Sequence, residues 1–372
     1  MKKGITIGID ARIPKEDKTG IPYVLHNIIP EMIALAPENQ YKMFGRGLDF
    51  ALPQVKPYHL NKLFIKGLTF LWRYIWWPSS GWFMGKTDAF LYTNFYYFPA
   101  RTKKKVLMIY DLAYIFYPQF AEKRNGPLLR RLVPKAIKKV DAIVTISQNI
   151  KKEIIDYYKV NPEKVHVIDL GCPDNVYRVE DQAKIVEAKK KYGIGKKYVL
   201  FVGTLQPRKN IEGAIRSYSL LAENLKNEYE LVVVGKKGWR YQEIFKLAKE
   251  CGVGNNVIFT GYVDENDISA IYSGATLFFF PAFYEGFGLP LLEAMVCAVP
   301  IVSSNNATLM EVGQDAVEYV NPHSVEDMRR GLALVLTDEK YAQELVEKGL
   351  IRKDHYSWEK AAQQLLDTLQ CS

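Results

Sequence analysis

Two glutamates bracket a glycine-containing turn in the C-terminal half of the chain. The segment FFFPAFYEGFGLPLLEAM, residues 278–295, leads from an apolar strand through Gly-Phe-Gly to Pro290, which suits the first turn of a helix. We therefore expect a helix to begin near Leu289, and its N-terminal amides would hold an anion such as a diphosphate. Glu285 and Glu293 would accept hydrogen bonds from sugar hydroxyls on either side.

A second segment carries the complementary charge. YVLFVGTLQPRKN is a strand that ends at Gly203 and continues to Arg208 and Lys209, two adjacent cations able to neutralise a diphosphate. A ligand with phosphates in its middle and a sugar at each end, such as a nucleotide sugar, would use all of these groups. The alternative is a plain tight turn with solvated glutamates and surface cations. The shared position at strand ends favours one site.

The elements that would position these groups alternate regularly along the chain. Nearly continuous apolar runs predict strands covered on both faces, and helix-period segments lie between them, as in SQNIKKEIIDYYKV with Ser147 as its cap. The predicted strands are KGITIGI, KVLMIYD, DAIVTIS and KVHVIDLG in the first half, and YVLFVGT, YELVVVG, NVIFTGY and ATLFFFP in the second. The pattern is repeated βαβ and predicts two doubly wound α/β domains.

Composition limits the class of protein. The 372 residues are 48% hydrophobic and 24% charged, values typical of a folded chain with two domains. The four cysteines form no CxxC pair, which indicates neither a disulfide framework nor a zinc site and favours a reducing cytoplasm. The N-terminus reads as a first strand and not as a secretory signal. No run of about eighteen apolar residues predicts a membrane span.

The positive charge is concentrated in the first half. Between residues 60 and 140 there are fifteen Lys and Arg against three Asp and Glu, within a chain of net charge +9. Such a surface attracts anionic partners, which include acidic lipids, phosphorylated substrates and nucleic acid.

Taken together, the motifs resemble a family-4 retaining glycosyltransferase of the GT-B architecture, similar to bacterial mannosyltransferases of polysaccharide and lipopolysaccharide assembly. The resemblance rests on FVGTLQPRKN, EGFGLPLLEAM followed by VPIVSS, GYV, VIDLGCPD and YSWEKAA. It implies an α/β fold of two doubly wound Rossmann-like domains facing across a cleft. We expect an acceptor-binding domain in residues 1–172 and a nucleotide-sugar-binding domain in 173–355. A C-terminal helix in 356–372 is expected to pack back toward the N-terminal domain.

The resemblance also implies a role for each donor-site residue. Arg208 and Lys209 would hold the diphosphate, Glu285 would contact the transferred sugar, and Glu293 would bind the ribose hydroxyls. Backbone amides of the glycine turn would touch the distal phosphate, the chain at GYV would border the base, and the loop TGIPYV would lie beneath the phosphates. The further donor-binding residues are Gly20, Gly203, Tyr262, Val263, Gly286, Phe287, Gly288 and Leu289.

In the N-terminal domain, LMIYDLAYIFYP matches a segment that in many relatives reads His-Asp-Leu. Here Tyr110 stands where that histidine usually faces the transferred sugar, which would also suit a 6-deoxyhexose such as rhamnose. Asp111 is counted with the catalytic residues, as a group that positions the acceptor, and a purely structural role is the alternative.

The implied reaction moves a hexose, with mannose favoured, from a nucleoside diphosphate sugar to a glycan or lipid-linked acceptor with retention of configuration. No Asp-x-Asp occurs, so we expect no metal and no cofactor beyond the nucleotide sugar. A nucleotide-sugar 2-epimerase or a sugar phosphorylase would share the architecture. A non-enzymatic adaptor for a membrane or nucleic acid would explain the positive charge of the first half, but not the diphosphate-binding motifs of the second. A nicotinamide dehydrogenase is disfavoured because no GxGxxG follows the first strand.

Two amphipathic segments suggest where the enzyme works. In LFIKGLTFLWRYIWW the apolar residues Phe64, Leu68, Leu71, Trp72, Ile75 and Trp76 share one helical face, opposite Lys66 and Arg73. LLRRLVPKAIKK likewise sets apolar residues against five cations. These faces would either pack on the sheet or lie in a membrane interface. We expect a cytoplasmic, peripheral enzyme at the inner leaflet of the plasma membrane that contacts anionic lipid and does not bind nucleic acid.

Overall fold

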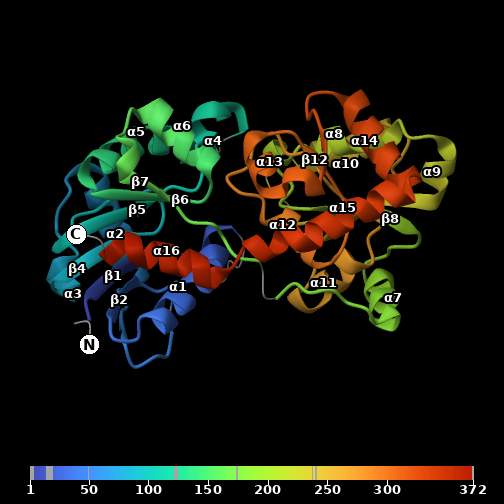
Figure 1. Ribbon diagram of the computed structural model, residues 1–372. Coiled ribbons are helices and arrows are strands. Elements are labelled where there is room, and N and C mark those ends of the chain that lie inside the picture. The colour runs from blue at the N-terminus through green and yellow to red at the C-terminus, as the bar shows by residue number, and fades with distance from the viewer. Residues whose placement is uncertain are drawn as a thin grey trace. The chain divides into compact units, whose positions relative to one another are not determined.

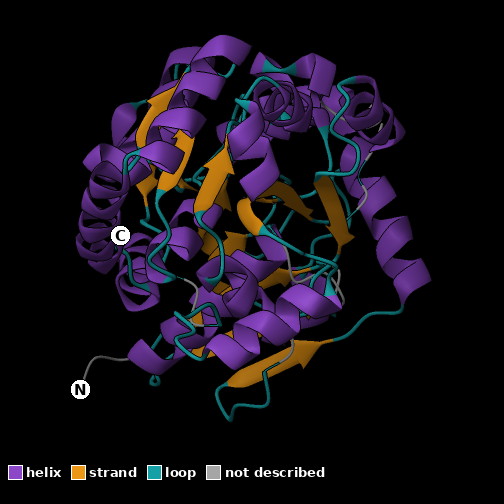
Figure 2. Cartoon of the chain, turned by 90° about the vertical axis from the view of Figure 1, so that its right-hand side faces the viewer, coloured by secondary structure: helices purple, strands orange, loops and turns teal. Residues whose placement is uncertain are grey.

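The chain folds into two compact units. The computed structural model describes residues 4–13, 20–48, 50–120, 125–172, 175–236, 238 and 241–370. The first unit comprises Met1–Gly171 with Ser357–Ser372, and the second comprises Cys172–Tyr356. Figure 1 traces the chain, and Figure 2 shows strands enclosed by helices. The predicted domain boundaries, 172/173 and 355/356, each lie one residue from these divisions.

The first unit is built on a parallel sheet of seven strands in the order β3-β2-β1-β4-β5-β6-β7. The order reverses beside β1, so β1 and β4 flank the topological switch point of this sheet. The strands are β1 (Thr6–Ala11), β2 (Gln40–Gly45), β3 (Val55–Tyr58), β4 (Thr87–Tyr92), β5 (Thr102–Met108), β6 (Ala142–Thr145) and β7 (Val165–Val167). The helices are α1 (Ile21–Leu35), α2 (Lys62–Tyr74), α3 (Gly81–Met84), α4 (Ala113–Phe116), α5 (Asn125–Lys139), α6 (Gln148–Tyr158) and α16 (Trp358–Gln370).

The last helix of the chain, α16, belongs to the first unit, where it lies beside α1 (Figure 1). The Trp358 ring meets the Tyr23 ring edge-on with centroids 6.2 Å apart, and the Gln364 side chain accepts a 2.9 Å hydrogen bond from the Asp169 N–H. A Cβ added at Gly171 would come within 2.4 Å of the Trp358 backbone nitrogen, so the chain passes too close to α16 for a larger residue there.

The second unit has six parallel strands in the order β10-β9-β8-β11-β12-β13. This is the order of a Rossmann-type sheet, with its switch point between β8 and β11. The strands are β8 (Lys197–Val202), β9 (Tyr229–Val234), β10 (Val257–Gly261), β11 (Leu277–Phe280), β12 (Ile301–Ser304) and β13 (Glu318–Val320). The helices are α7 (Gln182–Lys191), α8 (Ile211–Ser219), α9 (Glu223–Glu228), α10 (Tyr241–Glu250), α11 (Glu265–Ser273), α12 (Leu289–Val296), α13 (Ala307–Gly313), α14 (Val325–Thr337) and α15 (Glu339–Arg352).

Local sequence signals explain where the elements begin. The Ser147 hydroxyl accepts a hydrogen bond from the Ile150 N–H and caps α6, as predicted. Helix α12 begins at Leu289 with Pro290 in its first turn, also as predicted. Every residue of β11 is buried, in keeping with its continuous apolar sequence. None of the helices in the described ranges is long and apolar enough to cross a bilayer.

Candidate active site

Glycines end three neighbouring strands of the second unit. Gly203 follows β8, Gly235 follows β9 and Gly261 closes β10. The Gly203 N–H donates to the Val234 carbonyl at 2.9 Å, and the Gly235 N–H donates to the Gly261 carbonyl at 2.8 Å. A Cβ on Gly235 would lie 1.9 Å from the Gly203 carbonyl oxygen, so only glycine permits this approach. The chain segments that leave β8 and β9 therefore pack closely against each other at the carboxyl edge of the sheet.

Arg208 and Lys209 lie on a 3₁₀ turn, Pro207–Lys209, directly after this edge. The Lys209 Nζ lies 2.7 Å from Glu285 Oε1 and 4.8 Å from the centre of the Phe280 ring. The Arg208 guanidinium donates a 2.9 Å hydrogen bond to the Tyr284 carbonyl and lies 3.4 Å from the same Glu285 oxygen. The structure therefore brings together both predicted cations and the first predicted glutamate.

Because this ion cluster is buried, its charges strongly affect one another's pKa. Lys209 and Glu285 are both buried. Burial by itself would raise the pKa of Glu285, but the charges of Arg208 and Lys209 outweigh it and hold the pKa below its usual range. Burial lowers the pKa of Lys209, and Glu285 opposes that shift. Arg208 and Lys209 thus favour the ionised form of Glu285, and Glu285 in turn opposes the loss of the Lys209 proton.

The turn after Glu285 leads into α12 through an unusual backbone. Gly288 has φ of 118°, and a Cβ there would come 2.5 Å from the Leu309 side chain. No side chain caps the N-terminus of α12, and its first turn has no acidic residue. No side chain therefore occupies the start of α12, where the positive end of the helix dipole favours an anion, although the Leu291 N–H donates to the Gly288 carbonyl at 2.9 Å. Phe287 is buried with its ring edge-on to Tyr356, centroids 5.6 Å apart, which anchors the turn.

The second glutamate lies one turn into α12 beside a tyrosine that the sequence did not indicate. The Tyr272 hydroxyl, on α11, donates a 2.5 Å hydrogen bond to Glu293. Burial raises the pKa of Glu293, while the Tyr272 hydrogen bond and the charge of Lys209 oppose the rise. Glu293 and Lys209 therefore influence each other directly. Tyr272 and Glu293 are 21 positions apart in the sequence, and no spacing signal links them.

Asn210 was also missed as a positioning residue. Its buried side chain caps α8 by accepting from the Gly213 N–H at 3.2 Å and donates to the carbonyls of Pro281 and Pro322 at 3.0 and 2.9 Å. It thereby ties the cation turn to the loop that carries Glu285. An asparagine just before a helix is a capping signal, which could have identified the first of these contacts.

The other predicted site residues do not contact this ion cluster in the interactions described above. Tyr262 and Val263 follow β10, two strands from β8, and the half-exposed Tyr262 ring has the Lys236 Nζ 5.1 Å from its centre. In the first unit, Gly20 precedes α1 with φ of 60° and open space where a Cβ would point. The Asp111 carboxylate accepts from the Ala113 N–H at 3.1 Å, at the start of α4.

Tyr110 is buried, and its hydroxyl donates a 2.9 Å hydrogen bond to the Thr93 carbonyl. Burial raises its pKa well above the usual range. Its predicted contact with a sugar stays a prediction. No cluster of three metal-ligating His, Cys, Asp or Glu side chains occurs within the ranges that the structure describes.

Comparisons with known proteins cover most of the chain. The family model described as "Glycosyl transferases group 1" matches residues 184–352, and "Glycosyltransferase Family 4" matches residues 55–175. O-antigen chain mannosyltransferase B of Escherichia coli is 29% identical over 73% of this chain and 71% of its own length. The serotype-specific mannosyltransferase WbdA of Escherichia coli is 35% identical over 60% of this chain, which matches only 28% of that longer protein.

Solved structures share the fold at lower identity. WaaG, a glycosyltransferase involved in lipopolysaccharide biosynthesis, superposes with a TM-score of 0.71 at 17% identity and covers 99% of this chain and all of its own. HepE from Anabaena, in complex with UDP and glucose, superposes with a TM-score of 0.71 at 17% identity over 98% of this chain and 99% of its own.

Two Rossmann-like units, with a cationic and carboxylate-lined site at the switch point of the second, define a glycosyltransferase with the GT-B fold. The matched family models extend this assignment over both units. The chain is similar to family 4 glycosyltransferases over residues 55–175 and to group 1 glycosyl transferases over residues 184–352.

Proposed function

We propose that the protein transfers a hexosyl group, with mannose favoured, from a nucleoside diphosphate sugar to a glycan or lipid-linked acceptor. The observation that carries the proposal is the buried cluster of Lys209, Arg208 and Glu285 beside the uncapped start of α12. The names of the matched Escherichia coli mannosyltransferases support mannose.

In the proposed reaction, the bond between the anomeric carbon and the diphosphate oxygen breaks and a bond from the acceptor oxygen to that carbon forms. Negative charge grows on the departing diphosphate, where Arg208, Lys209 and the α12 amides stabilise it. The acceptor proton passes to an oxygen of the leaving phosphate, on the face that the diphosphate occupied, so the anomeric configuration is retained. Glu285 contacts the transferred sugar, and Glu293 accepts hydrogen bonds from the ribose.

The experiment that tests this function is a screen of nucleotide sugars by nucleotide release, followed by analysis of the sugar product. We expect release with one preferred donor and a new glycosidic product when an acceptor glycan is present. An epimerised nucleotide sugar formed without acceptor would identify a 2-epimerase. Consumption of inorganic phosphate with release of a sugar phosphate would identify a phosphorylase. Equal turnover of unrelated sugars would remove any specificity role for Tyr110.

We propose further that transfer needs no divalent metal, because Arg208 and Lys209 supply the positive charge on which the leaving diphosphate depends. Turnover in excess EDTA is expected to stay within about twofold of the untreated value, since side-chain cations replace the metal. A steady-state assay with and without EDTA checks this. Loss of activity that Mg²⁺ or Mn²⁺ restores would contradict it.

The first unit presents a surface suited to an anionic membrane. We define the aromatic surface as five exposed apolar side chains of α2 and the segment that follows it: Phe70, Tyr74, Ile75, Trp77 and Trp82. One contact joins it to the exposed cations of α5, since Arg131 lies 5.0 Å from the Tyr74 ring centre. Lys139 of the same helix lies 5.3 Å from the ring centre of the neighbouring, half-buried Trp76. Of the predicted apolar face, Leu68 and Trp72 are buried, whereas Phe64 and Ile75 are exposed. Helix α2 thus combines both predicted roles, core packing and exposure.

We propose that the aromatic surface and α5 attach the enzyme to anionic lipid at the cytoplasmic leaflet. Replacing Arg130 and Arg131 by glutamine is expected to weaken binding to anionic vesicles at low salt by about fivefold for each charge, or about 1 kcal/mol. Trp77→Ala with Trp82→Ala should weaken binding at every salt concentration, since apolar burial is not screened. Vesicle co-sedimentation measures both.

Tyr177→Ala is the matched control, because Tyr177 is a comparably exposed aromatic residue of the second unit. Its vesicle binding should equal that of the unmodified protein. Equal binding of the unmodified protein to neutral and anionic vesicles would show that charge does not direct attachment.

A further inference from the structure

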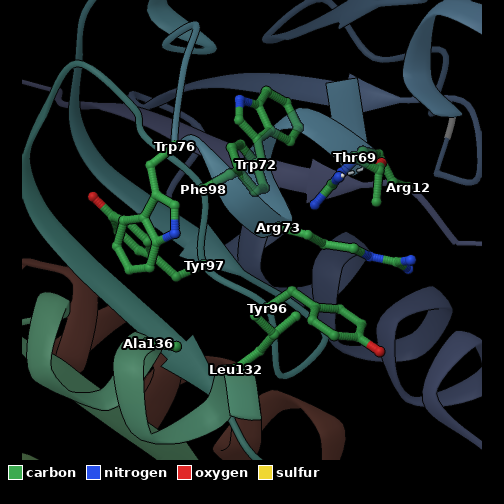
Figure 3. A pocket seen from close by; sticks show the side chains of 10 residues that line it. All are labelled: Arg12, Thr69, Trp72, Arg73, Trp76, Tyr96, Tyr97, Phe98, Leu132 and Ala136. Atoms are coloured by element: carbon green, nitrogen blue, oxygen red, sulfur yellow. Dashed lines mark hydrogen bonds between the residues drawn. The ribbon is translucent and has the colours of Figure 1, made fainter. Parts of the chain in front are cut away.

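The first unit has a pocket at its own switch point, apart from the site of the second unit. It is open to solvent and lies beyond the carboxyl ends of β1 and β4, between α2 and α5. Figure 3 shows its two ends. Trp76 and Tyr97 lie at one end, and Arg12, Arg73 and Tyr96 lie at the other, with Leu132 of α5 in the wall. Crevices at this position of an open α/β sheet commonly bind ligands.

The two arginines of the pocket differ in their partners. Arg12 donates to both oxygens of the buried Asp10, at 2.7 and 2.8 Å, and its guanidinium lies 4.3 Å from the centre of the Phe98 ring. Its charge is therefore neutralised and its position fixed. Arg73 pairs with no carboxylate among the residues that the structure describes. Within the described part of the chain, the cationic end therefore carries one positive charge that no carboxylate compensates.

Tyr96 adds a hydroxyl to the same end. Burial raises the pKa of Tyr96, and the nearby charges of Arg73 and Arg12 oppose the rise. The Tyr96 hydroxyl therefore stays protonated at neutral pH and able to donate a hydrogen bond beside the Arg73 guanidinium. A planar guanidinium with an adjacent hydroxyl is the chemistry that binds a phosphate group.

The opposite end leads toward the aromatic surface. The rings of Trp76 and Tyr97 lie 5.3 Å apart, and Trp76 is flanked in sequence by Ile75 and Trp77, both more than half exposed. A ligand in the pocket with an apolar chain could therefore extend that chain along exposed aromatic side chains of α2 and the segment after it. The pocket thus has the Arg73 guanidinium at one end and aromatic side chains at the other.

We propose that this pocket binds the phosphate or diphosphate of a lipid-linked acceptor, with Arg73 as its cation and the lipid chain lying on the aromatic surface. The inference rests on the proposed function, because it names the acceptor class of the same enzyme. It adds a second anion site, in the first unit, to the diphosphate site formed by Arg208 and Lys209 in the second.

Farnesyl diphosphate, a short soluble isoprenoid diphosphate, is the probe, and calorimetry measures its binding. Arg73→Gln should weaken binding at least tenfold. Lys66→Gln is the matched control, because Lys66 is an exposed cation of α2 outside the pocket lining, and should leave binding unchanged. Lys209→Gln should also leave it unchanged, since Lys209 belongs to the other unit. Thermal unfolding of Arg73→Gln that matches the unmodified protein shows that the first unit of the variant is folded.

Each other outcome overturns the proposal. Loss of binding in Lys209→Gln but not in Arg73→Gln would place the probe in the nucleotide site. Equal binding of farnesol would show that no anion is recognised, and equal, Arg73-dependent binding of inorganic diphosphate would identify a free phosphate site. If the unmodified protein does not bind the probe but still transfers sugar from a nucleotide donor, this inference fails and the proposed function stands.

Discussion

Lys209→Ala is expected to lower turnover by about 100-fold or more and to destabilise the second unit by about 3 kcal/mol. Turnover falls because the leaving diphosphate loses a preplaced cation. Stability falls because the buried Glu285 carboxylate loses the partner that lies 2.7 Å away. Steady-state kinetics and thermal or denaturant unfolding measure the two effects separately.

The double variant Lys209→Met with Glu285→Gln separates these causes. It removes both buried charges, so stability should return toward that of the unmodified protein while turnover stays low. Lys197→Ala is the control, because Lys197 forms a 2.8 Å ion pair with Glu228 in the same unit but both partners are largely exposed. It should change stability little, because solvent screens an exposed pair, and should leave turnover unchanged. If Lys209→Ala retains full turnover, Lys209 does not act on the leaving group.

The two glutamates should respond differently to substitution. Glu285→Gln keeps a hydrogen-bonding group near Lys209 but removes the negative charge, so nucleoside diphosphate binding should persist while turnover falls by about 100-fold. Glu293→Gln should weaken binding of nucleotide and nucleotide sugar alike, by about 10-fold or more, since it loses a charge-assisted hydrogen bond. Calorimetry and kinetics on both variants check the division.

Tyr272→Phe is the matched control for Glu293. It removes the hydroxyl that donates to Glu293 but leaves the carboxylate in place, so its effect on nucleotide binding should be smaller than that of Glu293→Gln. Equal damage to diphosphate binding from Glu285→Gln and Glu293→Gln would show that their roles are wrongly assigned.

Much of this fold could be predicted because its central strands are apolar on both faces. All eight predicted strands overlap an observed one. The strands β2, β3 and β4 were missed because QYKMFG, VKPY and TDAFLY mix polar residues into short runs, and β3 lies at the edge of its sheet. The short strands β12 and β13 carry Ser or Glu, which weakens the same signal.

The site was predictable as far as its chemistry follows from neighbouring residues. The cation pair, the glycine turn and the start of α12 are each encoded within a few residues, and the structure brings Arg208, Lys209 and Glu285 into contact. Contacts that depend on how separate elements pack were not predictable. The hydrogen bond of Tyr272 to Glu293 and the burial of the Tyr110 hydroxyl against Thr93 are of this kind.

For helix α2, the sequence likewise could not predict which apolar side chains would be buried and which would stay exposed. Its sequence predicts an amphipathic helix, but the period alone does not say which apolar residues the sheet will cover. Leu68 and Trp72 became core, whereas Phe70 and Ile75 stayed exposed. That division depends on the side chains that meet α2 from β2 and from the segment after β4, including the Phe98 ring stacked on Trp72 at 4.4 Å.

The central claim is that one site in the second unit binds the diphosphate of a nucleotide sugar through Arg208 and Lys209. Calorimetric titration of nucleoside diphosphates and the matching monophosphates tests it most directly. The account predicts that the preferred diphosphate binds at least tenfold more tightly than its monophosphate, and that this difference disappears when Arg208 and Lys209 are both replaced by alanine. Equal affinity for the two nucleotides, or a difference that survives the double substitution, would contradict it.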